Sequence, residues 1–243
     1  MALGKAVLEV SRFALNTIDL RSHSATHPRL GVVDHISCHP LTHSELSMGA
    51  AVAAARRIAR DLGSGVQALP TFLYGQAHPE GRHLADIRRK LGYFSPTKSS
   101  RKSSQSWTGP LDNWQVALQC VVPDFGPTQV DPRLGVTCVG ACSWIINFNV
   151  LLDTNNMTVS KRIARSVSQK GGGLEGVQAM ALQHADGIEI ACNLLAPDKS
   201  TPVEVENKII ELCQSANGGN ISVLRSYTTG RSIEELLQVF NSQ

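Results

Sequence analysis

The residues best suited to chemistry are His27, Pro28 and Arg29, which stand just before a run of apolar residues. Proline disfavours the helical region for the residue before it, so we expect His27 to lie in an extended loop. An imidazole titrates near neutral pH, so a histidine presented by a loop can accept and then donate a proton. The spacing alone is also consistent with a polar loop residue that has no catalytic role.

A second group of reactive side chains comprises His35, Cys38, His39 and His43. Imidazole and thiolate are good zinc ligands. Side chains alternate across a strand, however, so His35 and His39 would face one side and Cys38 the other. No second ligand pair with the spacing of a zinc finger follows. We therefore expect no metal site.

The composition is that of an ordinary globular protein. The chain has 243 residues, 42% hydrophobic and 18% charged, which is enough for one large or two ordinary domains. No apolar run approaches the roughly 20 residues needed to cross a bilayer, and Glu9 and Asp19 interrupt the first twenty residues, unlike a secretory signal. We expect a cytoplasmic protein whose six cysteines are reduced and mostly buried.

The net charge of +3 comes from one window of the chain. Residues 82–102 hold seven Lys and Arg residues against Asp86 alone, so the rest of the chain is acidic. Such a window can attract nucleic acid, but few aromatic residues are interleaved with it and it overlaps the Ser-rich residues 95–106. A solvated insertion is the preferred interpretation, with nucleic-acid binding as the alternative.

The elements that must position His27 alternate between helix and strand. Apolar residues from Leu3 to Ile18 recur at spacings of three and four, which predicts an amphipathic helix. Ser44 can cap an alanine-rich helix that Gly63 would end. The remaining elements expected in the first half are a strand at 30–38, that helix at 44–62, a strand at 68–74, a basic helix at 83–91 and a strand at 116–122.

The second half is more regular. We expect a strand at 141–152, a helix at 159–170, strands at 177–184 and 188–195, a helix at 203–215 and a strand at 221–227. Ser232 should cap a final helix. The order β-α-β-β-α-β is typical of a ferredoxin-like unit. The predicted fold class is therefore α/β (α+β), with two ferredoxin-like α/β sandwich subdomains at residues 1–138 and 139–243.

Four motifs, taken together and in order, resemble the formiminotransferase domain family. They are His27-Pro28-Arg29-Leu30-Gly31 with Asp34, Phe72-Leu73-Tyr74-Gly75, Pro123-Asp124-Phe125-Gly126-Pro127, and Gly140-Ala141 leading to Asn147-Phe148-Asn149. The resemblance covers nearly the whole chain. It implies two subdomains that face each other across a cleft for tetrahydrofolate.

The resemblance also implies the site residues. His27 matches the family's catalytic histidine. The folate-binding segment matches Gly126, Pro127, Thr128, Gln129, Val130, Asp131, Pro132, Arg133, Leu134 and Gly135. It further implies a transferase of one-carbon metabolism and histidine catabolism, with tetrahydrofolate as co-substrate, glutamate-type small molecules as partners, no metal, and a homodimer as a possible assembly.

The residue types suit that chemistry. A formimino group that moves from the amine of glutamate to N5 of tetrahydrofolate requires one proton to leave the attacking nitrogen and another to reach the departing amine, and one imidazole can do both. Gly126, Pro127 and Pro132 would form a stiff loop that approaches a flat pterin closely. Arg133 or Arg29 could bind a substrate carboxylate, although Arg29 is equally consistent with a surface ion pair.

The departures from the family leave a second interpretation open. Gln76 stands where the family usually has glutamate, Leu134 replaces a tryptophan, and Cys142 with Ser143 replaces a basic pair. The family's usual N-terminal segment is also missing, so we expect an incomplete first subdomain with unpaired strand edges. The alternative is therefore a folate-binding or interaction protein that has lost turnover.

Overall fold

The computed structural model describes residues 2–22, 24–25, 28–41, 45–65, 67–93, 107–108, 118, 121–215 and 221–242. The chain divides into two compact units, Met1–Cys142 and Ser143–Gln243. The boundary expected at residue 138 falls inside a strand, whereas the observed division follows the end of that strand. The α/β (α+β) class is confirmed, because both units combine helices with sheets.

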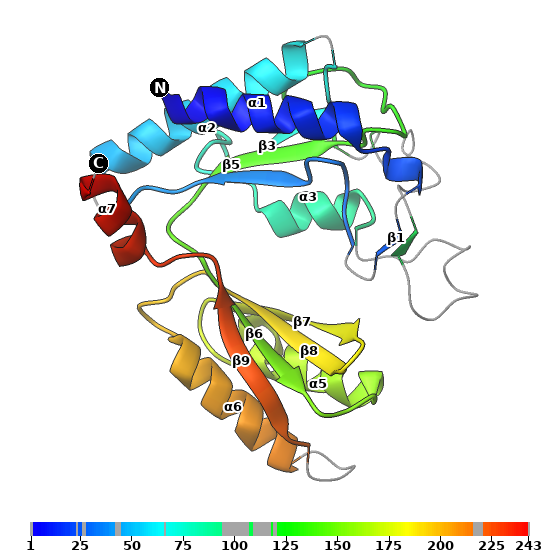
Figure 1. Ribbon diagram of the computed structural model, residues 1–243, viewed down its shortest axis with the longest axis vertical. Coiled ribbons are helices and arrows are strands. Elements are labelled where there is room, and N and C mark those ends of the chain that lie inside the picture. The colour runs from blue at the N-terminus through cyan, green and yellow to red at the C-terminus, as the bar shows by residue number, and fades with distance from the viewer. Residues whose placement is uncertain are drawn as a thin grey trace. The chain divides into compact units, whose positions relative to one another are not determined.

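The first unit is built on three parallel strands (Figure 1). The order across the sheet is β2-β5-β3, so both outer strands pair with β5 and not with each other. A short antiparallel pair joins β1 to β4. The elements of this unit are α1 (Ala2–Thr17), η1 (Leu20–Ser22), β1 (Ser24–Ala25), β2 (His35–Cys38), α2 (Glu45–Ser64), β3 (Thr71–Gly75), α3 (Leu84–Lys90), β4 (Trp107–Thr108) and β5 (Thr137–Ala141).

Helices cover both faces of this sheet, as a buried parallel sheet requires. The alanine-rich α2 packs on one face, beside α1, and α3 lies on the other (Figure 1). Alternate residues of one strand therefore reach different cores. Phe72 and Tyr74 of β3 join the core under α3, whereas Leu73 joins the core under α2.

Three expectations for the first half need correction. The strand expected at 30–38 is confined to β2, because the N–H of Leu30 donates to the carboxylate of Asp34 and the residues up to Val33 lie outside the strand. The expected strand at 116–122 lies mostly outside the described residues, and Val121 and Val122 are not in a strand. The central strand β5 differs from the expectation, because the strand expected nearest to it begins at Ala141, where β5 ends.

Gly63 does not end the alanine-rich helix. Helix α2 continues to Ser64, and a Cβ at Gly63 would lie 2.7 Å from the Cβ of Phe125 and 2.8 Å from the N of Gly126. The glycine is needed for close packing of the helix on this loop. The predicted cap Ser44 lies outside the described residues.

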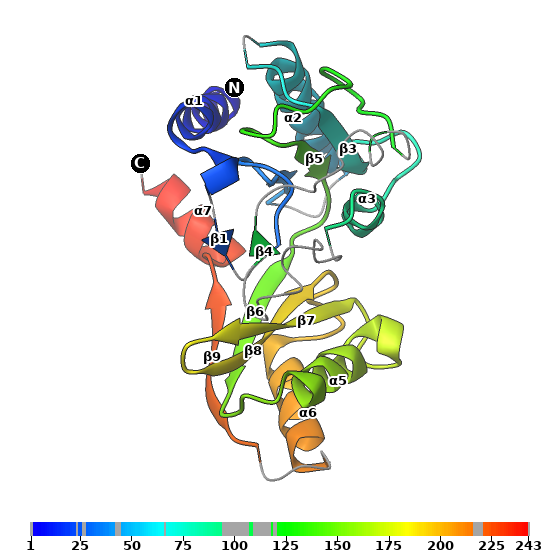
Figure 2. The same cartoon turned by 90° about the vertical axis from the view of Figure 1, so that its right-hand side faces the viewer.

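The second unit has the ferredoxin-like strand order β7-β8-β6-β9, with every neighbouring pair antiparallel. Helices α5 and α6 cover the same face of the sheet (Figure 2). The β-α-β-β-α-β prediction is therefore confirmed. The elements are β6 (Ile146–Leu152), α5 (Met157–Val167), η3 (Gln169–Gly171), β7 (Val177–His184), β8 (Gly187–Leu194), α6 (Pro202–Ser215), β9 (Val223–Thr229) and α7 (Ile233–Asn241).

Local capping explains two helix starts in this unit. The predicted cap Ser232 is confirmed, because its hydroxyl accepts from the N–H of Glu235 while the Glu235 carboxylate accepts from the N–H of Ser232. Helix α5 begins earlier than expected because Asn156 accepts from the N–H of Val159. The strand expected at 141–152 is confined to β6, because its first residue, Ala141, is the last residue of β5 in the other sheet.

In the described part of the chain, no helix is both long and apolar enough to span a membrane.

Hydrogen exchange should distinguish the two sheets. Strand β8 pairs on both sides, whereas β2 pairs only with β5 among the described residues and is only partly buried. Amide protection follows pairing and burial, so we expect native-state exchange of the β8 amides to be much slower than that of the β2 amides. Equal protection would mean that another element pairs with the outer edge of β2.

Candidate functional site

The backbone joins the predicted histidine motif to the predicted folate segment. The N–H of Val32 donates to the carbonyl of Leu134 (2.9 Å) and the N–H of Val136 donates to the carbonyl of Leu30 (3.0 Å). Gly31 and Gly135 form the antiparallel bridge between these bonds. Two sequence motifs about a hundred residues apart therefore lie side by side. His27 itself lies outside the described residues, so its catalytic role stays a prediction.

The folate segment is a surface loop that becomes buried at its C-terminal end. Thr128, Gln129, Asp131 and Pro132 are exposed, and Val130 packs against the core under α3. Leu134 is buried with Leu15 and Leu69 instead of facing solvent. The family's tryptophan is thus replaced at a packing position, and a bound ligand could contact the exposed residues of the loop that precede Leu134 but not Leu134 itself.

Gly126 is required by contacts within the protein. Its φ is +89°, and a Cβ there would clash with the carbonyl oxygen of Leu69. The sequence-based interpretation placed a pterin at this close approach, whereas the structure places the backbone of Leu69 there. Gly135 is similar, with a φ of +73° and a position at which an added Cβ would clash with the carbonyl oxygen of Leu30.

We expect Gly126→Ala to destabilise the first unit by more than the roughly 1 to 2 kcal/mol that a left-handed backbone alone costs a residue with a Cβ. Gly172→Ala is the matched control, because Gly172 has a φ of +87° and no atom near the added Cβ. Chemical unfolding followed by hydrogen exchange in β3 and β8 measures both effects. Equal losses for the two variants would show that the loop absorbs the clash.

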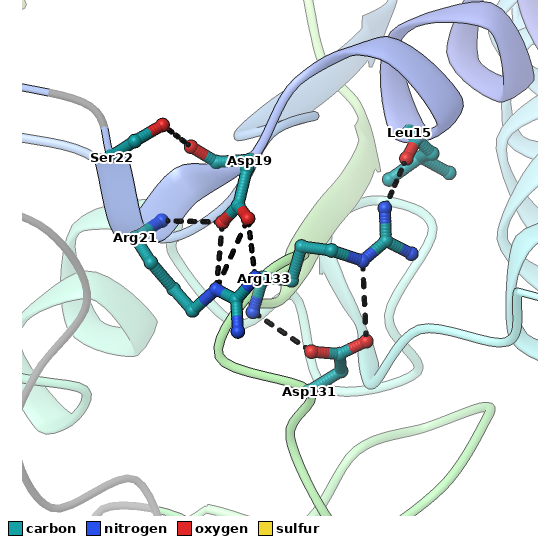
Figure 3. A network of polar contacts seen from close by, with 6 residues as sticks. All are labelled: Leu15, Asp19, Arg21, Ser22, Asp131 and Arg133. Atoms are coloured by element: carbon teal, nitrogen blue, oxygen red, sulfur yellow. Dashed lines mark hydrogen bonds and ion pairs between the residues drawn. The ribbon is translucent and has the colours of Figure 1, made fainter.

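Arg133 anchors the loop to the end of α1 (Figure 3). Its Nη1 donates to the carbonyl of Leu15 at 3.0 Å, its Nε lies 3.8 Å from the carboxylate of Asp131, and its carbonyl accepts from the N–H of Leu20. Arg21 and Asp19 form a neighbouring bidentate pair, and the hydrogen bond from Arg21 lowers the pKa of Asp19 to about 2. Arg133 therefore serves the fold and is a poor candidate for a substrate carboxylate.

Arg29 is the other residue that the sequence analysis named as a candidate for binding a substrate carboxylate. Its side chain is partly buried, and burial lowers the pKa of its guanidinium, while the charge of Asp34 raises it. The position beside the antiparallel bridge of Gly31 with Gly135 suits a residue that contacts a ligand at this loop.

Asp34 holds the histidine motif in place. Its carboxylate accepts from the N–H of Leu30 at 2.6 Å and from Nη2 of Arg88 at 2.6 Å. Burial raises the pKa of Asp34, but the hydrogen bond from His35 and the charge of Arg88 outweigh burial and hold that pKa below its ordinary value. Arg88 also lies over the ring of Tyr93, 4.5 Å from its centroid. This clamp connects the turn before β2 to α3.

Asp124 covers the outer edge of β3. Its carboxylate accepts from the N–H of Leu73 at 2.8 Å and from Arg82 at 2.5 Å, while Arg82 also donates to the carbonyl of Leu73. The Asp-Phe-Gly motif therefore completes an edge strand. Arg82, Arg88 and Arg89 all pair with carboxylates, so much of the described basic window is neutralised locally.

Tyr74 and Gly140 are a packing pair. A Cβ at Gly140 would lie 2.5 Å from the Tyr74 ring, so the glycine makes room for the aromatic side chain. Burial raises the pKa of Tyr74 above its ordinary value. The neighbouring Gln76 is exposed, and its N–H donates to the carbonyl of Ala141.

Sequence reasoning missed a row of polar side chains on the second sheet. On the face that α5 and α6 leave uncovered, directly opposed residues of all four strands are exposed and polar: Gln178, Asn193, Asn147 and Thr229. The signal in the sequence was alternation, because Asn147 and Asn149 flank the core residue Phe148. Amide groups both donate and accept, so this face can bind a polar planar ligand.

The same face contains a buried carboxylate. Glu189 is 3% exposed and accepts from the hydroxyl of Tyr227 at 2.6 Å and from the amide of Asn149 at 3.1 Å. Nε2 of His184 lies 3.4 Å away. These contacts fix the orientations of Tyr227 and Asn149, two residues next to the polar row.

Comparisons with known proteins agree with this architecture. Residues 1–142 match the formiminotransferase domain, N-terminal subdomain. A formiminotransferase cyclodeaminase-like protein of Arabidopsis thaliana is 41% identical over 244 residues, covering 99% of this chain and 78% of that protein. A glutamate formimidoyltransferase of Thermoplasma acidophilum is 32% identical, covering 82% of this chain and 60% of that protein. A formimidoyltransferase-cyclodeaminase of Gallus gallus is 28% identical, covering 94% of this chain and 40% of that protein.

The fold and these matches define a two-unit α/β protein of the transferase type. The chain belongs to the formiminotransferase domain family.

Proposed function

We propose that this chain transfers a formimino or formyl group between glutamate and tetrahydrofolate, with His27 as the general acid and base. The observation that carries the proposal is the backbone pairing of residues 30–32 with residues 134–136, which brings the His27 motif to the folate segment in a member of this family. A relative named glutamate formimidoyltransferase supports the choice of substrates.

The proposed reaction needs two proton transfers. N5 of tetrahydrofolate attacks the formimino carbon and must lose a proton, while the glutamate nitrogen must gain one as its bond to that carbon breaks. A single imidazole near neutral pH can take the first proton and deliver the second. The bridge between Gly31 and Gly135, which joins the His27 motif to the folate segment, supports this role.

The exposed residues of the folate segment are the proposed contacts for tetrahydrofolate, and the amide row of the second unit is proposed, by itself, as a polar binding surface. Thr128 and Gln129 offer hydrogen-bonding groups on the loop, and Asn147 and Asn193 offer them on the sheet. Amide side chains match the donor and acceptor pattern of a pterin edge or of a glutamate tail.

The second candidate function is folate binding without turnover. It is favoured by Cys142 and Ser143, which stand where the family has a basic pair, because loss of two positive charges would weaken binding of a carboxylate donor. In this case the chain would bind tetrahydrofolate but leave the donor unchanged.

One pair of measurements separates the two functions. The purified chain is mixed with formiminoglutamate and tetrahydrofolate, release of glutamate is followed, and folate affinity is measured in parallel by calorimetry. Turnover supports the transferase. Binding without turnover supports the second candidate, and absence of both overturns the two proposals together.

A further inference from the structure

Cys142 and His39 lie side by side at the carboxyl end of the first sheet. Each is the residue that directly follows a strand, Cys142 after β5 and His39 after β2. The N–H of Cys142 donates to the carbonyl of Cys38 at 3.3 Å, which extends the parallel pairing by one step. The backbone therefore fixes the two side chains as neighbours.

The thiol has two polar contacts. Its Sγ lies 3.3 Å from Oγ of Ser37 and 3.8 Å from Nδ1 of His39. The same Nδ1 lies 3.1 Å from the carbonyl oxygen of Cys142, so a protonated Nδ1 has both the oxygen and the sulfur within reach. A hydroxyl and an imidazole N–H can together stabilise a thiolate.

This environment separates Cys142 from the other described cysteines. Burial raises its pKa, but hydrogen bonds from His39 and Ser37 outweigh burial and bring the pKa below its ordinary value. Burial raises the pKa values of the remaining described thiols: Cys38, Cys138, Cys192 and Cys213. Cys142 is also half-buried, whereas Cys138, Cys192 and Cys213 are buried.

Among the described residues, Cys38, Tyr74 and His39 are the titratable groups whose charge interacts with that of Cys142. The negative charge of its thiolate repels the ionised forms of Cys38 and of Tyr74 on β3, and this repulsion contributes to the raised pKa values of both groups. His39 is the neighbour that lowers the pKa of Cys142 through its charge. The reactivity of the thiol should therefore depend on His39.

We propose that Cys142 is a modification site at which hydrogen peroxide oxidises the thiolate to a sulfenic acid. The sulfur attacks one peroxide oxygen, the S–O bond forms as the O–O bond breaks, and hydroxide leaves and takes a proton to become water. Sulfur loses two electrons and the peroxide gains them. This site does not depend on the proposed transfer reaction.

The test treats the intact chain with limiting hydrogen peroxide at neutral pH and traps sulfenic acid with dimedone. Labelling of each cysteine is measured by mass spectrometry of peptides. We expect Cys142 to be labelled several-fold faster than the four cysteines with raised pKa values, because the thiolate population falls about tenfold per pKa unit while the nucleophilicity of the more basic thiolate offsets only part of that fall. Labelling of Cys142 no faster than that of Cys38 would overturn the proposal.

The role of His39 is tested by the pH profile of labelling. His39→Asn keeps a hydrogen-bond donor but removes the ionisable ring, so the pH midpoint of Cys142 labelling should rise. The rate at neutral pH should fall roughly fourfold for each unit of that rise, because a more basic thiolate is scarcer but more nucleophilic. The exposed His83 provides the control His83→Asn, which should leave the profile unchanged.

A second variant covers the case in which His39→Asn fails to fold. Ser37→Ala removes the hydroxyl 3.3 Å from the sulfur and should also raise the midpoint. An unchanged midpoint in a folded variant of either residue would overturn the assignment.

Discussion

Turnover of formiminoglutamate should fall by about a hundredfold to ten-thousandfold in His27→Ala, equivalent to roughly 3 to 5 kcal/mol of transition-state stabilisation. The reason is that both proton transfers would lose their acid and base. Folate affinity should change little, since the ligand contacts proposed above come from other residues. Steady-state kinetics and calorimetry measure the two quantities.

His83→Ala is the matched control for His27→Ala. His83 is exposed, and as the residue before α3 it makes no side-chain capping hydrogen bond. Its replacement should leave kcat unchanged. If the His27→Ala variant had the same kcat for formiminoglutamate as the parent chain, His27 would have no part in the mechanism.

Asp34→Ala should lower the free energy of unfolding of the first unit by about 3 kcal/mol. The substitution leaves Arg88 without its partner and the N–H of Leu30 without an acceptor. Loss of one member of a buried pair costs about 3 to 5 kcal/mol, and we expect the lower end because Asp34 and Arg88 retain some exposure. Denaturant unfolding measures the change.

Two further variants isolate the cause of that loss. Asp34→Asn keeps an acceptor for Leu30 but removes the charge, so its loss should be smaller. Asp19→Ala breaks a solvent-exposed pair with Arg21 and should change stability little. A loss for Asp34→Ala no greater than that for Asp19→Ala would contradict the clamp.

The clamp also predicts an acid limit for the first unit. The pKa of Asp34 is lower in the folded chain than in the unfolded chain, so its ionised form stabilises the fold above the unfolded value of about 3.9. That contribution is lost as the pH falls through the folded pKa. Asp34→Asn should therefore weaken the dependence of stability on pH in this range.

Features that depend on neighbouring residues could be predicted from the sequence. The first helix follows from the spacing of apolar residues, and the start of α7 follows from Ser232 and Glu235 three residues later. The second sheet was predictable because its strands and helices alternate at short range. Each of these patterns involves residues that lie close together in the sequence.

Features that depend on distant residues could not be predicted in the same way. Nothing near β5 shows that it inserts between β2 and β3, because both partners lie at least sixty residues earlier in the chain. The contact of Asp34 with Arg88 joins residues 54 apart. Resemblance placed the folate segment, but only the structure shows that Gly126 and Leu134 serve packing.

The central position of β5 has a consequence for synthesis of the chain. Strands β2 and β3 pair only with β5 among the described residues, and residues 76–136 separate β3 from it. At about 5 to 20 residues per second, a ribosome needs roughly 3 to 12 s to translate that interval. During this time β2 and β3 are already synthesised but have unpaired edges, to which chaperones can bind. A message truncated before Thr137 would leave both strands without the partner that joins them.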